Sequence, residues 1–172
     1  MELFDVLDIH GNPTGITARR GTGVILQEGQ HYLGINAYIY NTKFEFLIQQ
    51  RSYNKDFAPG RWDIHAGHVI ACESSEEGMI REVKEEIGLD IEPNNICAVK
   101  RVFYRESPLI VDIFFINKEY ELDKIVFKKD EVIAVKTISG KEMIDMVRNS
   151  DFRPDEYRDI VIKELKNIVP VM

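Results

Sequence analysis

The chain has 172 residues, of which 44% are hydrophobic and 30% charged, and this composition predicts one globular domain over residues 1–172. Its net charge of -7 argues against a nucleic-acid polymer as partner, because neutralising a phosphate backbone requires a basic face. No apolar run approaches the roughly 20 residues that span a bilayer, and the acidic N-terminus does not resemble a signal peptide. We therefore expect no membrane association and a cytoplasmic location, which two cysteines also suit.

The first half of the chain shows the patterns of paired strands. Residues 3–8 and 16–19 flank a turn-rich segment, and together they predict an N-terminal hairpin over about residues 1–20. Two further strands are expected at 33–40 and 44–50. The following residues, 51–62, mix cations, aromatic side chains and turn formers and are expected to form a loop.

A helical period begins at Ser74 and ends at Ile87. Met79, Ile80 and Val83 share one face with Ile87, serines stand at the start, and Gly88 follows as a C-terminal stop.

The remaining segments predict strands at 99–104, 109–116 and 132–138, then helices at 139–148 and 155–168. The C-terminal helices thus occupy about residues 139–169. This order indicates an α/β fold with a mixed sheet.

Three carboxylates stand together on the central helix. Glu82, Glu85 and Glu86 have the spacing i, i+3, i+4, which places them on one helix face. Their mutual repulsion is relieved if a divalent cation lies among them, and oxygen ligands favour Mg²⁺, with Mn²⁺ as a substitute. Such ions commonly complete their coordination with substrate phosphates. The alternative is a solvated glutamate face with ion pairs to Arg81.

The residues around these carboxylates have a recognisable spacing. Residues 67–89 read Gly67-x5-Glu73-x7-Arg81-Glu82-Val83-x-Glu85-Glu86-Ile87-Gly88-Leu89. This segment resembles the Nudix signature at each of its fixed positions.

The resemblance implies an α/β/α sandwich that carries its site on a loop-helix-loop motif. It also implies that Glu82, Glu85, Glu86 and the carbonyl of Gly67 hold the metal. By the same likeness, Glu73 and Arg81 pair to hold the loop against the helix. A departure is Gly78, where family helices usually have alanine; it costs about 1 kcal/mol of helix propensity and suggests crowding or tolerance there.

The residues before this signature resemble those of one branch of the superfamily, the branch related to type I isopentenyl diphosphate isomerase. The similar stretch is Gln49-Gln50-Arg51-Ser52-x-x-Lys55-x-x-x-Pro59-Gly60-x-Trp62-Asp63. The likeness implies that Arg51 and Lys55 bind the phosphates of the substrate, for which guanidinium and ammonium groups are suited.

The isomerase reaction itself needs a cysteine and a glutamate that this sequence lacks at the matching positions. Ala66 stands where the relatives have the cysteine before a Gly-His pair, and Ile110 stands where they have the glutamate. The alternative that His65, His68 and Cys72 bind zinc is disfavoured, because no fourth ligand is nearby in sequence.

The sequence thus predicts a Mg²⁺-dependent hydrolase that cleaves a diphosphate bond in a nucleoside-diphosphate-type or other organic small molecule, using an activated water. The candidates for the catalytic base are Glu85, Glu86 and Glu131, with Asp112 a weaker one. The alternatives are an isopentenyl diphosphate isomerase and a module that senses a nucleotide or diphosphate without turnover. A homodimer is left open.

Overall fold

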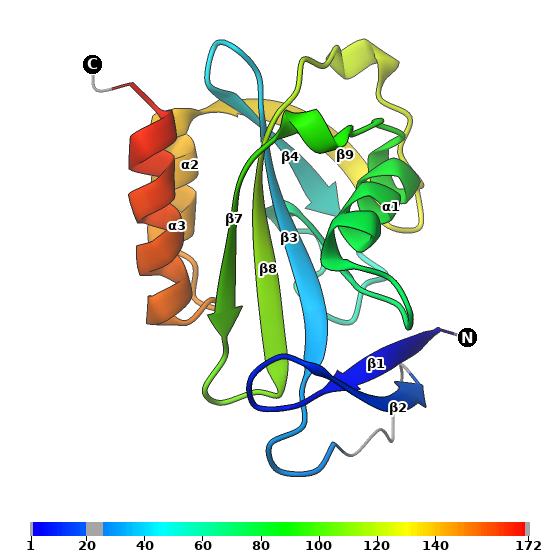
Figure 1. The fold of residues 1–172 in the computed structure, drawn as a ribbon. Coiled ribbons are helices and arrows are strands. Elements are labelled where there is room, and N and C mark those ends of the chain that lie inside the picture. Colours follow the sequence, from blue (N-terminus) through cyan, green and yellow to red (C-terminus); the bar gives the residue numbers. More distant parts are fainter. Residues whose placement is uncertain (1, 20–25, 171–172) are drawn as a thin grey trace.

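The computed structural model describes residues 2–19 and 26–170. A mixed β-sheet separates helix α1 (Ser75–Ile87) from helices α2 (Gly140–Arg148) and α3 (Asp155–Ile168), as Figure 1 shows. The predicted α/β/α sandwich is therefore confirmed. The two C-terminal helices lie against one another and on the sheet face opposite α1.

The described strands of the main sheet follow the order β5-β4-β3-β8-β7, with β6 paired to β3 and β9 paired to β4. Strands β3 and β8 run parallel, whereas the other pairs are antiparallel. Their bounds are β3 Tyr32–Tyr40, β4 Glu45–Arg51, β5 Trp62–Asp63, β6 His65–His68, β7 Ile96–Phe103, β8 Leu109–Asn117 and β9 Val132–Ser139.

Strands β3 and β4 diverge, and this divergence makes room for the site. They pair only at Ile39↔Leu47 and Tyr40↔Phe46, next to the turn that joins them. The first half of β3 pairs with β6 instead, with Ile35 opposite Gly67. Strand β6 is thereby placed beneath α1, and the two elements contact one another.

Two apolar layers fill the space on either side of the sheet. On the α1 side, Met79, Val83 and Ile87 are fully buried against apolar side chains of β3, β4 and β8. On the other side, α2 and α3 bury their own apolar stripes against the opposite faces of these strands. The alternation of side chains along each strand supplies both layers.

The ends of α1 lie where the sequence predicts them. The Ser74 hydroxyl accepts a hydrogen bond from the Glu77 amide, and the Glu77 carboxylate accepts one from the Ser74 amide at 2.8 Å. At the other end Gly88 adopts φ 69°, a left-handed conformation, and its amide donates to the Lys84 carbonyl. Helix α1 is thus fixed at both termini by local hydrogen bonds.

An N-terminal hairpin is present, with β1 (Leu3–Leu7) antiparallel to β2 (Pro13–Arg19), which begins three residues before the predicted strand at 16–19. It lies at the lower end of the molecule in Figure 1. The later strands match their predicted positions, except that β7 begins three residues earlier, at Ile96. Among the helices of the described residues, none combines the length and apolar character needed to cross a membrane.

Candidate active site

A polar cavity of about 140 Å³ lies between α1, β6 and two loops. It brings together residues from distant parts of the chain that the sequence identified as site candidates. The residues that line it are Glu2, Lys55, Ala66, Gly67, Glu82, Glu85, Glu86, Lys128 and Glu131. Six of the eight candidates therefore share one cavity: the three helix carboxylates, Gly67, Lys55 and Glu131.

Glu82 is packed directly against the backbone of β6. A Cβ atom on Gly67 would lie 2.3 Å from the Glu82 carboxyl carbon, so any larger residue there would force the Glu82 side chain to move. The His68 amide donates to Glu82 Oε1 at 3.3 Å. Burial raises the pKa of Glu82, the neighbouring Arg81 charge lowers it, and the Glu86 charge raises it again. The carboxylate is thus held in a position that disfavours its own charge.

Glu86 is 5% exposed and is held by a chain of hydrogen bonds from the sheet. The side-chain amide of Gln49 makes both contacts. Its Nε2 donates to Glu86 Oε2 at 2.9 Å, and its Oε1 lies 3.0 Å from His65 Nδ1. Because Gln49 Oε1 can only accept, His65 Nδ1 is the donor in this contact. Sequence reasoning assigned no role to Gln49 and considered His65 only as a zinc ligand. The signal that would have found Gln49 is an amide that directly follows the apolar run of β4.

Arg81 ties the loop before α1 to the helix, as the signature implied. Its guanidinium donates to both Glu73 carboxylate oxygens at 2.9 and 3.0 Å and to the His68 carbonyl at 2.9 Å. It also lies 3.2 Å from Glu82 Oε1. The hydrogen bond to Glu73 is the main reason why the pKa of Arg81 is raised. A Cβ on Gly78 would lie 3.0 Å from Glu73 Oε2, so the glycine relieves crowding next to this pair.

The wall of the cavity opposite α1 carries both basic and acidic side chains. Lys55, from the loop after β4, pairs with Glu131, which precedes β9. Lys128 Nζ lies 3.7 Å from the same carboxylate. The backbone also closes this wall, because the Lys128 amide donates to the Glu86 carbonyl and the Ser52 amide to the Glu131 carbonyl. The cation and the distal glutamate predicted from sequence therefore face the helix carboxylates.

Arg51 is the candidate that the structure does not bring into this cavity. Its Nε donates to the Phe57 carbonyl at 3.0 Å, and its guanidinium lies over the Phe57 ring. Asp112 is likewise engaged elsewhere, because Arg101 donates to both of its oxygens at 2.7 Å. Neither residue lines the cavity.

The cavity fits a hard divalent cation by its donor chemistry. Glu82, Glu85, Glu86, Glu131 and the Gly67 carbonyl present oxygen donors, the kind that Mg²⁺ and Mn²⁺ prefer. Within residues 2–19 and 26–170, however, no three His, Cys, Asp or Glu side chains are grouped closely enough to hold an ion as they stand. Arg81 pairs with Glu82, and Lys55 pairs with Glu131. These ion pairs would have to open before the carboxylate oxygens could bind a cation.

Among the described residues, His65, His68 and Cys72 form no such group either. His65 is fully buried beside Glu86, whereas Cys72 is exposed. The positions that matched the isomerase residues hold Ala66, which lines the cavity, and Ile110, which is fully buried. Neither side chain can transfer a proton.

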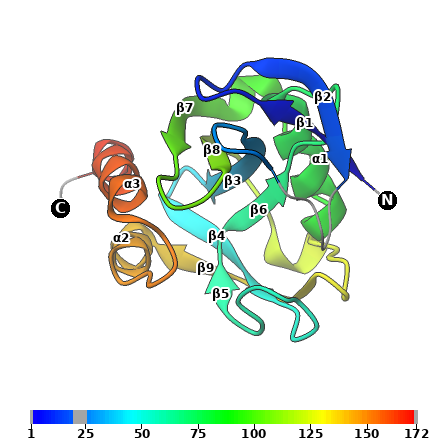
Figure 2. The same cartoon turned by 90° about the horizontal axis from the view of Figure 1, so that it is seen from below.

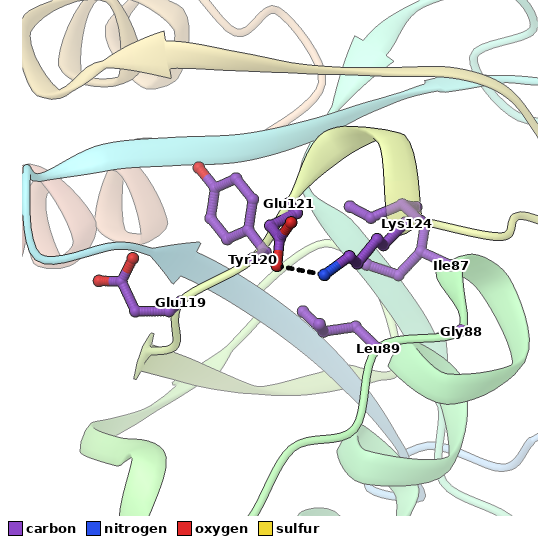
Figure 3. A pocket seen from close by; sticks show the side chains of 8 residues that line it. Ile87, Gly88, Leu89, Glu119, Tyr120, Glu121 and Lys124 are labelled. Carbon is purple, nitrogen blue, oxygen red and sulfur yellow. Dashed lines mark hydrogen bonds and ion pairs between the residues drawn. The ribbon is translucent and has the colours of Figure 1, made fainter.

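A larger cavity of about 390 Å³ lies at the C-terminal end of α1, shown in Figure 3. It is lined by Ile87, Gly88 and Leu89 and by the segment 119–121 with Lys124 and Ile125. Its polar groups already have partners, for Lys124 pairs with Glu121 and the Tyr120 hydroxyl donates to a backbone carbonyl. Since it contains no site candidate, the smaller polar cavity is the candidate active site.

The chain is similar to known proteins in sequence and in fold. Residues 30–157 match the family model for the NUDIX domain. An uncharacterised Nudix hydrolase of Listeria innocua is 32% identical over 173 residues, which cover 99% of each chain. An isopentenyl-diphosphate Delta-isomerase of Photorhabdus laumondii is 26% identical over 86% of this chain and 79% of its own, in agreement with the branch resemblance.

The fold has a solved counterpart as well. A crystal structure of a Deinococcus radiodurans protein superposes with a TM-score of 0.70, covering 96% of this chain and 99% of that one at 15% identity. The signature at residues 67–89, the α/β/α sandwich and the matched domain model all indicate the same family. The chain belongs to the Nudix hydrolase family.

Proposed function

We propose that this Nudix hydrolase cleaves the diphosphate bond of a small organic substrate with the help of Mg²⁺ held in the polar cavity. The observation that carries the proposal is the convergence of Glu82, Glu85 and Glu86 with Glu131 and Lys55 around one cavity. This arrangement combines oxygen ligands for a cation with a cation for phosphate, in a chain of net charge -7 that otherwise repels polyanions.

The residues divide into two groups. Glu82, Glu85, Glu86 and the Gly67 carbonyl are assigned to the metal, which when bound would neutralise phosphate charge and acidify a water. Lys55 is assigned to a substrate phosphate. Its ammonium group would leave the Glu131 carboxylate and bind a phosphate oxygen instead. Arg51 stays a proposed phosphate ligand that must swing away from Phe57 to reach the cavity.

Glu131 is proposed as the general base. It lies on the wall opposite α1, so it can accept a proton from a water while the helix carboxylates remain with the metal. When Lys55 turns to the substrate, the Glu131 carboxylate is released from its ion pair and can accept that proton. Glu85 and Glu86 are the other candidates, but Glu86 already accepts a hydrogen bond from Gln49.

The test is phosphate and pyrophosphate release from a panel of nucleoside di- and triphosphates, dinucleoside polyphosphates, sugar nucleotides and isopentenyl diphosphate, with and without Mg²⁺. Glu85→Gln should abolish turnover, whereas Glu76→Gln, an exposed glutamate of the same helix, should leave it unchanged. Glu131→Gln should lower kcat by about 100-fold without altering the Mg²⁺ requirement, as expected for loss of a base.

Two results would refute the proposal. The first is turnover of isopentenyl diphosphate to its isomer with no phosphate released. The second is binding of a panel member without its conversion, which would indicate a sensing module.

A further inference from the structure

Lys128 is a second lysine that lines the polar cavity, besides Lys55. It belongs to the segment before β9, on the wall opposite α1 that also carries Glu131. Figure 2 shows the loop after β4, which carries Lys55, beside the yellow segment that leads into β9, and hydrogen bonds join the two segments. Two ammonium groups and one carboxylate therefore meet on this wall.

Both lysines hold the same carboxylate. Lys55 forms an ion pair with Glu131 Oε2, and Lys128 Nζ lies 3.7 Å from Glu131 Oε1. Each ammonium group thus faces a different oxygen of one planar anion. These three side chains together have a formal charge of one positive unit, and they face the three carboxylates of α1 across the cavity.

The backbone of Lys128 is fixed, whereas its side chain is exposed. Its amide donates to the Glu86 carbonyl at 3.0 Å, and its carbonyl accepts hydrogen bonds from the Glu131 and Val132 amides at 2.8 and 2.9 Å. The side chain is 56% exposed, and an exposed ion pair of this kind contributes little to stability. The ammonium group can therefore leave Glu131 at small cost while the backbone keeps it at the cavity.

Lys55 is tied to the same segment from the other loop. The Ser52 amide donates to the Glu131 carbonyl at 2.9 Å, and the Lys55 amide donates to the Ser52 carbonyl at 3.2 Å. The two lysines thus come from loops that are joined by backbone hydrogen bonds, and one carboxylate brings their ammonium groups together.

We propose that Lys128 and Lys55 together bind the diphosphate of the substrate, one lysine to each phosphate, and that Glu131 holds both lysines until the substrate arrives. This inference rests on the hydrolase function proposed above and adds a second phosphate-binding cation to it. Carboxylates and phosphates both accept charge-assisted hydrogen bonds from ammonium groups, so one anion can replace the other. Glu131 is then released from both ion pairs when the diphosphate binds.

The position of Lys128 distinguishes it from Arg51, the cation that the sequence resemblance groups with Lys55. Lys128 already lines the cavity, whereas Arg51 does not and donates to the Phe57 carbonyl. Lys128 therefore needs only a side-chain movement within the cavity to reach a phosphate.

The test measures binding of imidodiphosphate, a diphosphate analogue whose P–N–P bridge resists hydrolysis, to the full chain with Mg²⁺ by calorimetry. Lys128→Met should weaken binding about tenfold, in line with the loss of one charge-assisted hydrogen bond. Lys128→Arg, which keeps the charge, should lose much less. Lys129→Met is the matched control, because it removes the same charge from an exposed neighbour that does not line the cavity, and it should leave binding unchanged.

Titration with Mn²⁺, followed by electron paramagnetic resonance, separates a lost phosphate contact from damage to the site. Lys128→Met should bind Mn²⁺ at least as tightly as the parent chain, because removing a positive charge does not weaken a cation site. Weaker Mn²⁺ binding would show that the substitution disturbs the turn that holds Glu86, and it would overturn the inference. So would equal losses of imidodiphosphate affinity in Lys128→Met and Lys129→Met, an unchanged affinity in Lys128→Met, or no binding by the parent chain.

The proposed function can fail separately from this inference. Imidodiphosphate binding that depends on Lys128, in a chain that releases no phosphate from any substrate of the panel, would support the inference and refute the hydrolase. Turnover of a panel member together with an imidodiphosphate affinity that Lys128→Met leaves unchanged would support the hydrolase and overturn the inference.

Discussion

At the scale of single residues, the site contains one partly buried carboxylate whose charge the fold disfavours. Glu82 has a raised pKa because burial outweighs the attraction of Arg81. The folded chain therefore holds this proton more tightly than the unfolded chain. That contribution to stability is complete below the ordinary glutamate pKa and is lost as pH rises through the folded value.

It follows that Glu82→Gln should stabilise the metal-free protein near neutral pH, because it removes a charge that folding disfavours. We expect the Tm in EDTA to rise by a few degrees at pH 8 and the difference to shrink toward pH 4. Thermal unfolding of the variant and of Glu76→Gln at both pH values checks this. A lower Tm at pH 8 would mean that the ionised carboxylate is stabilising.

The contact between Gly67 and Glu82 makes a second prediction. In Gly67→Ala the new Cβ would lie 2.3 Å from the Glu82 carboxyl carbon, and such overpacking costs about 1–3 kcal/mol. Chemical denaturation should show this loss. In the double variant with Glu82→Ala most of it should disappear, because the clashing side chain is gone. Additive losses would show that strain at Gly67 arises from the backbone.

A third prediction concerns the hydrogen bond from Gln49 to Glu86. Gln49→Leu keeps the size of the side chain but leaves Glu86 without its amide donor, and loss of such support to a metal ligand typically weakens metal affinity by 10–100-fold. The Mg²⁺ concentration for half-maximal activity should rise by about tenfold, and saturating Mg²⁺ should restore kcat. A lowered kcat that no amount of Mg²⁺ restores would contradict a positioning role.

Gln49 and His65 also show where reasoning from sequence stops at this scale. The spacing of Glu82, Glu85 and Glu86 is local, so one helix turn is enough to predict that they share a face. The partner of Glu86 is 37 positions away in sequence, and its identity depends on how β4 meets α1.

At the scale of elements, the strength of the local pattern decided what could be predicted. Helix α1 has a full apolar period, an N-cap serine and a C-terminal glycine, so both of its ends were predicted. Strands β5 and β6 have 2 and 4 residues and no apolar alternation. They form because the divergence of β3 from β4 leaves backbone groups to be paired, which is a tertiary cause.

The N-cap of α1 is expected to contribute measurably to stability. Ser74→Ala removes the hydroxyl that caps the Glu77 amide and should lower the free energy of unfolding by about 1 kcal/mol. Ser75→Ala, one position later and inside the helix, is the matched control and should change it by less than about 0.5 kcal/mol. Urea denaturation compares the two, and equal effects would exclude a specific capping role.

At the scale of the whole molecule, the sandwich and the family could be predicted because residues 67–89 resemble the Nudix signature at each of its fixed positions. The wall of the cavity opposite α1 could be predicted from the sequence only in part. Lys55 and Glu131 were identified separately, but their ion pair joins positions 76 residues apart. Arg51 was grouped with Lys55 by resemblance, whereas the structure places it with Phe57.

The central claim is that the polar cavity holds divalent cations through the helix carboxylates. Titration with Mn²⁺, followed by electron paramagnetic resonance, measures this directly on the full chain and on two variants. We predict that the parent and Glu76→Gln bind Mn²⁺ equally and that Glu86→Gln binds it at least tenfold more weakly. Equal binding by all three proteins, or no binding by any, would contradict the claim.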